Sequence, residues 1–478
     1  MLSFVENSGD IIVLLLFFGV SIFIHELGHF LVAIKLGLVV DTFSIGFGPA
    51  IWKKEVNGIV FKICWIPLGG YVALPQLDPT GMSTVQGVSE DCKEVEHRVL
   101  PEISPARRIA VSVAGAAGNV VLAVVFAMII WLSPGAITYK GAPVIESVEE
   151  SSAVYASGLR GGDEIIAINE KQVSTWYDVS MEMLLIGSST NVDLVVQSGQ
   201  DQRSISVPMV MHEGAEIPVF EGIARQTTPC ILKAIIPDSR AEEAGLMEND
   251  IIKTFDGIKV TGTREFISLV GTRAEKKVPI VIEREGEELT LEVIPKYSDQ
   301  YERALIGVQP MDFILPWMQE KRPIAQLKSD AMRIVRLLKA LVTPKEAKNA
   351  ASGMGGPVMI FAALWMAIKI SMFNAIGFLR FLNINLAILN LLPLPILDGG
   401  HVMFALWEGV TKRKVNAKVV NVLVNACGVI LIGIFLIITF RDVDRIFPKI
   451  RSMFSRGDKT ECVTNAVQTN AVEDINGE

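Results

Sequence analysis

The sequence predicts a polytopic α-helical membrane protein with four transmembrane helices, a membrane-associated β-sheet and two inserted, mainly β domains. Apolar residues make up 50% of the 478 residues, and the mean hydropathy is +0.42; both values are high for a water-soluble protein. Four separate stretches approach the roughly 20 apolar residues that cross a hydrocarbon core. A long polar segment between the second and third stretch contains an internal repeat.

The four predicted transmembrane helices are long apolar runs with few charged residues. They cover residues 10–36, 106–132, 374–393 and 420–440. A further apolar run at 359–372 is shorter, and we expect a half-buried or interfacial helix there. Glu6 and Asp10 precede the first run and no Lys or Arg does, so it lacks the basic segment of a signal peptide and is expected to be retained.

The first run contains the pentapeptide His25-Glu26-Leu27-Gly28-His29. On a helix the two histidines are one turn apart on the same face, so both imidazoles can bind one zinc ion. Glu26 can then act as general base on a zinc-bound water. With five His in 478 residues, a chance match is expected on the order of 0.002 times per chain. The alternatives are histidines satisfied by carbonyl groups, or a proton relay in a transporter.

The third ligand must come from elsewhere, because a catalytic zinc needs three protein ligands and one open position. His97 lies in a polar, acidic loop and His212 lies in the insert, so neither is attractive. Asp398 is the better candidate, in the run NLLPLPILDGG directly after the third apolar run. Proline and glycine predict a helix break there, which would aim the carboxylate inward. The alternative is an exposed turn with Asp398 as a helix N-cap.

Residues 43–74 predict a small β-sheet at membrane depth. Asn57-Gly58 is a hairpin turn signal between two apolar runs. An open strand edge at that depth could pair with an extended substrate. The alternative is an ordinary hairpin in water. Glycines that permit tight turns and close backbone approach are Gly46, Gly48, Gly69 and Gly70.

The polar insert contains two related copies. SSAVYASGLRGGDEIIAINEKQV begins at Ser151 and DSRAEEAGLMENDIIKTFDGIKV at Asp238, an offset of 87 residues. The pattern resembles bacterial PDZ domains, which bind peptide C-termini by strand addition. Glu170 and Asn249 stand where glycine is usual. We expect one such domain at 137–219 and the other at 220–310; peptide binding and a steric or regulatory role remain alternatives.

The remaining segments have simpler predictions. An amphipathic helix at 324–342 lies in a linker at 311–356, on the membrane surface, against the PDZ pair or as a plain connection. The membrane core then comprises residues 1–136 and 357–450. The tail at 451–478 is polar and predicted to be disordered.

Charge and cysteine content limit the possible functions. The net charge of −8 gives no global basic footprint for nucleic acid. Five scattered cysteines without a CxxC pair imply neither a disulfide framework nor a zinc site.

These motifs, in this order, resemble the site-2 family of intramembrane zinc metalloproteases, over about residues 1–450. The resemblance implies one zinc per chain held by His25, His29 and Asp398, with Glu26 activating the water. Asn390 matches the motif asparagine that positions substrate or polarises the scissile carbonyl, and Asn385 is expected to share that work. Further residues expected at the substrate are Pro393, Pro395, Gly69 and Gly70.

One departure from the family lies in the second run. GAAGN, from Gly115 to Asn119, stands where relatives often have GPxxN, so Ala116 replaces a proline. We expect this departure to alter helix packing without touching a ligand.

The resemblance also implies a biological role. Such proteases cut a transmembrane helix of a single-pass membrane protein, often an anti-sigma factor already trimmed by another protease, in a stress response. Some also clear remnant signal peptides. The protein would lie in a bacterial inner membrane with periplasmic PDZ domains that exclude untrimmed substrates. A transporter with a proton path, and a membrane-tethered scaffold with an inactive site, are the competing hypotheses.

Charge bias gives a divided prediction for the membrane orientation. Basic residues between the third and fourth runs favour the cytoplasm for that loop: Lys412, Arg413, Lys414 and Lys418. The absence of basic residues before the first run favours a periplasmic N-terminus. Arg441, Arg445 and Lys449 argue the other way at the C-terminus. The family resemblance places both termini in the periplasm.

Overall fold

The structure is a computed structural model that describes residues 2–455 with internal gaps. The gaps are residues 78–100, 134–135, 137–140, 188–190, 212–217, 226–228, 261, 285, 299–302, 312–315 and 414. His97, His212 and the tail from residue 456 therefore lie outside the described residues.

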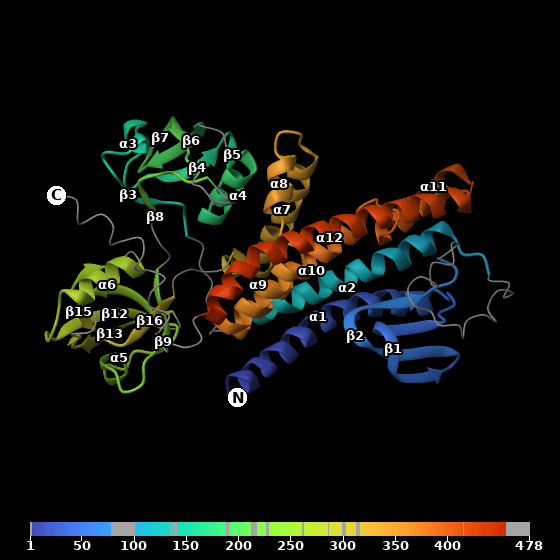
Figure 1. The fold of residues 1–478 in the computed structure, drawn as a ribbon, viewed down its shortest axis with the longest axis horizontal. Helices are drawn as coiled ribbons and strands as arrows, with labels where there is room; N and C mark the ends of the chain where they lie inside the picture. Colours follow the sequence, from blue (N-terminus) through green and yellow to red (C-terminus); the bar gives the residue numbers. More distant parts are fainter. Residues whose placement is uncertain are drawn as a thin grey trace.

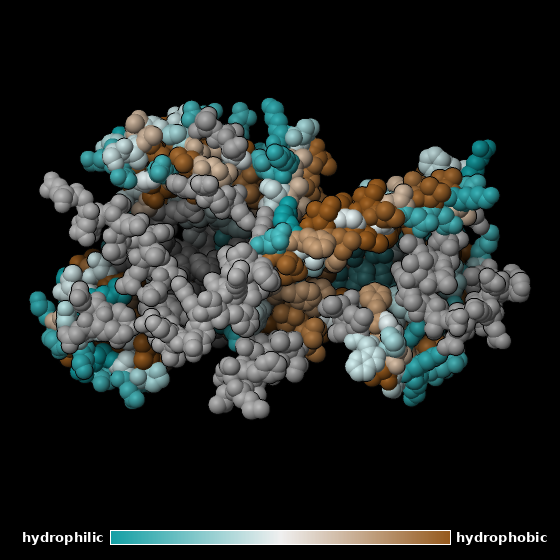
Figure 2. Space-filling model, in the orientation of Figure 1, coloured by the Kyte–Doolittle hydropathy of each residue, from teal (hydrophilic) through white to brown (hydrophobic). Residues whose placement is uncertain are grey.

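Within the described residues, four helices are long and apolar enough to cross a membrane, as predicted. They are α1 (Leu2–Lys35), α2 (Pro105–Leu132), α10 (Met372–Asn390) and α12 (Ala417–Ser455). Half of the apolar window of α10 and 44% of that of α2 are buried, against 11% for α1 and for α12. The helix pair α2 and α10 therefore forms the inside of the bundle. Hydrophobic residues cover much of the outer surface of the bundle (Figure 2).

The shorter apolar run forms α9 (Pro357–Ile370), which follows α8 (Ala347–Gly353) after a bend of 54°. Asp442 of α12 accepts hydrogen bonds from the backbone N–H groups of Gly356 and Met359, at 3.0 and 3.1 Å. These bonds satisfy donors at the start of α9, which have no partner within the helix itself. The bend is therefore tied to the fourth transmembrane helix.

The segment after α1 is a long antiparallel hairpin, β1 (Thr42–Val56) and β2 (Ile59–Ala73). Asn57 and Gly58 have φ of 53° and 79°, the two positive values that a type I′ turn requires. The hairpin curls, because Thr42 pairs with both Val60 and Ala73. The sheet lies beside the end of α1, and together with α11 (Asp398–Thr411) it marks one end of the helix bundle (Figure 1).

The first insert unit folds around a core that includes Ile145, Ile168 and Leu194, all with no exposed surface. Strand β8 pairs with β3, so Ile223–Arg225 belongs with this unit, beyond residue 219 where we predicted its end. A three-residue strand gives no periodic signal in sequence. The elements are β3 (Ile145–Val148), α3 (Ala153–Ala156), β4 (Glu164–Ile168), β5 (Lys171–Gln172), α4 (Trp176–Ile186), β6 (Asn191–Ser198), β7 (Asp201–Pro208) and β8 (Ile223–Arg225).

The second insert unit repeats this plan around its own core, in which Phe255 and Phe266 pack edge to face. Strands β13-β12-β10-β9-β16 run side by side in its main sheet. The elements are β9 (Cys230–Ile235), α5 (Arg240–Glu243), β10 (Ile251–Phe255), β11 (Ile258–Lys259), α6 (Thr263–Gly271), β12 (Val278–Arg284), β13 (Glu287–Val293), β14 (Lys296–Ser298), β15 (Arg303–Leu305) and β16 (Val308–Met311). Both units lie at the end of the bundle away from β1 and β2 (Figure 1).

Among its described residues, the linker contains two α-helices, α7 (Pro323–Val342) and α8, where one was predicted. The short 3-10 helix η3 (Pro316–Met318) precedes α7. A buried ion pair joins α7 to the membrane core. Arg380 of α10 donates from Nε to Asp330 Oδ2 at 2.7 Å and from Nη1 to Gln326 Oε1 at 2.5 Å. Asp330 and Gln326 have no exposed surface and Arg380 is 1% exposed, so α7 is fixed directly against α10.

Candidate metal centre

The first two site residues are presented by an unbroken helix. His25 and His29 lie on consecutive turns of α1, and their Nε2 atoms are 3.2 Å apart. Helix periodicity alone places the two rings on one face. The sequence prediction of a shared face is thus what the structure shows.

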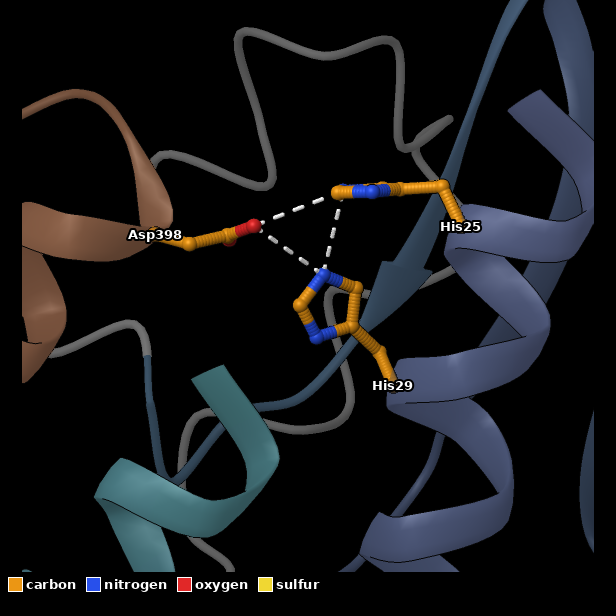
Figure 3. A group of neighbouring side chains, drawn as sticks. All are labelled: His25, His29 and Asp398. Carbon is orange, nitrogen blue, oxygen red and sulfur yellow. Dashed lines mark hydrogen bonds and ion pairs between the residues drawn. The ribbon is translucent and has the colours of Figure 1, made fainter. Parts of the chain in front are cut away.

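The third residue stands at the start of a helix. Helix α10 ends at Asn390, and α11 begins at Asp398 after a tight turn. Gly399 and Gly400 pack against that turn, because a Cβ on either would overlap backbone atoms of residues 391–395. Leu397 is the N-cap of α11 and no side chain caps this helix, so Asp398 does not serve as the N-cap that the alternative interpretation required. Its side chain points toward α1 instead (Figure 3).

Three side-chain atoms from these segments form a nearly regular triangle (Figure 3). Asp398 Oδ2 is 3.4 Å from His25 Nε2 and 3.4 Å from His29 Nε2. Zinc–ligand bonds of 2.0–2.1 Å at tetrahedral angles give ligand separations of about 3.3–3.4 Å. Asp398 Oδ2 is buried and has no hydrogen-bond partner among the described residues. A carboxylate oxygen facing two imidazole nitrogens at these separations therefore fits a zinc ion.

Helix α2 contacts the far side of both imidazole rings. His29 Nδ1 lies 2.8 Å from the carbonyl oxygen of Val111, and His25 Nδ1 lies 3.3 Å from the Asn119 amide nitrogen. Between them, a Cβ on Gly115 would overlap His29 and meet His25. The sequence interpretation missed Asn119, although it noted the GAAGN motif; the four-residue spacing of positions 111, 115 and 119 was the available signal.

Glu26 lies on the same helix as the two histidines and faces the β-sheet of β1 and β2. The backbone N–H of Val72 donates to its carboxylate. A Cβ added to Gly70 would lie 3.1 Å from Glu26 Cγ and 2.8 Å from the carbonyl oxygen of Ser44, so only glycine lets the strand approach so closely. The structure therefore places a carboxylate between the metal-ligand triangle and strand β2.

The expected substrate-binding residues are dispersed around this centre. Asn390 Nδ2 lies 3.5 Å from His25 Nε2, whereas no described contact joins Asn385 to the three ligands. Asn385 lies on α10 with its Oδ1 buried and unpaired among the described atoms. Pro393 and Pro395 lie in the turn before α11, and Gly69 has φ of 147° on β2.

Two imidazole nitrogens on a membrane helix and a carboxylate oxygen at the start of α11, beside a second carboxylate, form the donor set of a metallohydrolase. Comparison with known proteins makes the class specific. The chain belongs to peptidase family M50, whose sequence model matches residues 13–434, and it is a zinc metalloprotease of the site-2 protease type.

Curated relatives share nearly the full length. The chain is 29% identical to the regulator of sigma-E protease RseP of Escherichia coli over 93% of this chain and 100% of that protein. It is 26% identical to the regulator of sigma E protease of Haemophilus influenzae, again over 93% and 100%. A Vibrio cholerae protein described as a zinc metalloprotease is 27% identical over 90% of this chain and 97% of its own length.

Among solved structures, the PDZ domain of the SdrC-like protein from Listeria monocytogenes matches 19% of this chain and 90% of that domain. Its sequence identity is 19% and its TM-score 0.16. After the repeated sequence pattern described above, the two insert units are hereafter called the first and second PDZ domains.

Proposed function

We propose that this protein is an intramembrane endopeptidase that hydrolyses peptide bonds within or near transmembrane segments of single-pass membrane proteins. The triangle of His25, His29 and Asp398 carries the proposal, because it joins two distant segments of a membrane bundle at zinc-ligand separations. One zinc ion per chain fits this set of donors. Zinc supplies a Lewis acid, which makes water a nucleophile near neutral pH and polarises a carbonyl group.

Glu26 performs the proton transfers in this proposal. It accepts a proton from water as the water oxygen attacks the carbonyl carbon of the substrate. It then delivers that proton to the amide nitrogen as the carbon–nitrogen bond breaks, so a carboxylate and an amine are released. The Val72 N–H holds the Glu26 carboxylate in place, and Gly70, which has no side chain, leaves room for Glu26.

The substrate must unwind before it can be cut. Every interior peptide group of a helix is hydrogen-bonded within the helix, and a helix with side chains is about 10–12 Å wide. Strand β2 lies beside Glu26, so an extended segment that pairs with this sheet would present its carbonyl groups to the site. Gly69, Gly70, Pro393 and Pro395 would shape that channel. Asn390 would hold the scissile carbonyl, with Asn385 supporting it from α10.

Charge supports the proposed orientation in the membrane. Several basic residues lie at the end of the bundle that carries β1, β2 and α11: Lys53, Lys54, Lys62, Arg107 and Arg413. Basic residues favour the cytoplasmic side. The opposite end, which carries both PDZ domains, would then face the periplasm of a bacterial inner membrane. There the PDZ pair would admit anti-sigma-type substrates only after trimming, or bind peptide ends; remnant signal peptides are a second substrate class.

Zinc content and cleavage, measured on the same preparations, test the proposal. Full-length protein in detergent is compared with Asp398→Ala and Glu26→Gln, using elemental analysis and cleavage of a single-pass membrane substrate. We expect about one zinc in wild type and in Glu26→Gln, and much less in Asp398→Ala. Cleavage should fall on the order of 10²–10⁴-fold in Glu26→Gln. Wild type without zinc, or Glu26→Gln with full activity, would overturn the proposal.

A further inference from the structure

Helices α1 and α2 meet along two matching stripes. On α1, His25 and His29 are four residues apart. On α2, Val111, Gly115 and Asn119 are also four residues apart, so they share one face. Val111 contacts His29 through its carbonyl oxygen, and Asn119 contacts His25 through its side-chain amide. Gly115 lies between them, and both rings occupy the space that a Cβ at this position would need.

The contact at His29 fixes the protonation of that ring. A carbonyl oxygen only accepts, so the 2.8 Å contact requires His29 Nδ1 to carry the proton and donate to Val111. The other nitrogen, Nε2, then keeps its lone pair on the side facing Asp398. A metal-binding imidazole normally has such a partner behind it, because the partner sets the tautomer and the ring orientation.

Asn119 stands in the equivalent place behind His25. The side chain is 1% exposed, and its Nδ2 is 3.3 Å from His25 Nδ1. Its Oδ1 is buried without a hydrogen-bond partner among the described residues. A buried amide oxygen left unpaired costs free energy, about 1–3 kcal/mol. Turning the amide by half a revolution exchanges the two atoms in the same space and brings the oxygen to Nδ1.

The turned amide gives both histidines the same state. Asn119 Oδ1 then accepts a hydrogen bond from His25 Nδ1–H, and His25 Nε2 presents its lone pair to the triangle. With the nitrogen toward the ring instead, Asn119 would donate to Nδ1 and the proton would sit on Nε2, where it would block metal binding. The zinc chemistry thus favours the turned orientation, because only there does His25 Nε2 keep its lone pair for the metal.

We propose that Asn119 is a positioning residue that accepts the Nδ1–H of His25, so that α2 supplies the outer shell of hydrogen bonds for both histidine ligands. The inference rests on the proposed zinc ligation and adds a residue that touches neither zinc nor substrate. It also gives a role to a motif whose tightest position, Gly115, allows the two helices to approach.

Three variants of the full-length protein in detergent test this role. Asn119→Asp keeps an acceptor and removes the donor; Asn119→Leu keeps the size and removes both. Ser112→Ala is the control, because Ser112 is buried on the same helix and its hydroxyl has no described hydrogen bond. Zinc affinity is measured by competition with a chromogenic chelator, and the visible spectrum of the Co²⁺-loaded protein reports the geometry of the ligands.

We expect Asn119→Leu to weaken zinc binding about 10–100-fold and to alter the Co²⁺ spectrum, since these are the usual consequences of losing an outer-shell partner. The zinc affinity of Asn119→Asp should be no more than a few-fold weaker than that of wild type, and its Co²⁺ spectrum should match the wild-type spectrum. Ser112→Ala should match wild type in both measurements.

Two results would overturn the inference while wild type still binds zinc. One is a leucine variant that folds and binds zinc as wild type does. The other is an aspartate variant that loses 10-fold or more, which would show that Asn119 acts as a donor; this variant decides the question even if the leucine variant does not fold. Absence of zinc from wild type would instead overturn the proposed function.

Discussion

The two segments that carry the three proposed metal ligands are held in place by different means. His25 and His29 belong to one continuous helix, and a neighbouring transmembrane helix contacts the back of both rings. Asp398 follows a helix break, in a turn that two glycines keep tight. The helix before that break, α10, is fixed by Arg380 to the linker helix α7. The histidine segment is thus braced inside the membrane, whereas the aspartate segment is also connected to the soluble insert.

That connection continues into the first PDZ domain. Arg336 of α7 donates to both oxygens of Glu182 of α4, at 2.6 and 2.7 Å, and to Glu346 at 2.6 Å. Lys171 of β5 also bonds Glu346. The first PDZ domain is therefore linked through α7 to the helix that precedes Asp398.

Substitution of one proposed ligand at a time should give the largest effects and should show the difference in stability between the two segments. Both His29→Ala and Asp398→Ala should weaken zinc binding by more than about 1000-fold, since a structural zinc site is worth roughly 10–16 kcal/mol shared among its ligands. Without metal, His29→Ala should be less stable by about 0.5–1.5 kcal/mol, because the hydrogen bond from His29 to the Val111 carbonyl is lost. Asp398→Ala should destabilise the protein less than His29→Ala does, because Asp398 Oδ2 makes only two 3.4 Å contacts with the histidines and no hydrogen bond.

Thermal unfolding in chelator measures this difference. Equal destabilisation by both substitutions would break the comparison, since it would show that Asp398 is packed as firmly as His29.

Loss of the α7 anchor should have the next largest effect. Asp330→Ala leaves Arg380 buried without its partner, which should cost about 3–5 kcal/mol. The double substitution Asp330→Leu with Arg380→Met should recover most of that stability. Thermal unfolding measures both. A single Asp330→Ala variant with wild-type stability would show that α7 does not hold α10.

A methyl group in the tight turn should mainly affect activity. Gly400→Ala forces the turn outward, since its Cβ would overlap Leu394 and Pro395, and a ligand displaced by about 1 Å can cost about 100-fold in rate. Gly19→Ala on α1 is the matched control, because nothing lies within 4 Å of its Cβ; it should keep full activity and gain up to about 1 kcal/mol of helix stability. Equal rates in the two variants would count against the tight turn as the support of Asp398.

The smallest expected effect is that of acid on the contact between Glu346 and the first PDZ domain. Burial alone would raise the pKa of Glu346, but hydrogen bonds from Arg336 and Lys171 outweigh it and hold the pKa below the ordinary value of 4.5. Its stabilisation is therefore complete above about pH 4.5 and is lost as pH falls through the lower folded value. We expect at most about 1 kcal/mol, because the Lys171 side chain is 40% exposed and solvent screens its contact with Glu346.

Hydrogen exchange of α4 between pH 7 and pH 4, wild type against Glu346→Gln, measures this effect. The difference between the two proteins should shrink as pH falls below about 4.5; a constant difference across the range would assign the contact to packing instead of charge.

Sequence reasoning succeeded where local signals decide the structure. The helix period placed His25 beside His29, the Asn57-Gly58 pair set the hairpin, and hydropathy located four membrane helices. The approach of Asp398 to α1 followed only from chemistry and family resemblance, since 369 residues separate it from His29.

Other features had no local signal. Ion pairs across distant elements, such as Arg380 with Asp330, depend on tertiary packing that periodicity does not encode. Strand β8 is three residues long, too short for any pattern. Asn119 was visible within a motif, but its meaning required knowing which helix faces α1.

The small buried share of α1 has a consequence for how substrates would reach the site. With 11% of its apolar window buried, α1 shares with α12 the smallest buried share among the four membrane helices, and in the proposed function a membrane-spanning substrate reaches it from within the bilayer. Encounter is then diffusion in two dimensions, governed by substrate per unit of membrane area instead of per volume. In micelles, added detergent should slow cleavage at constant bulk concentrations by surface dilution, and the apparent KM should scale with the detergent-to-protein ratio.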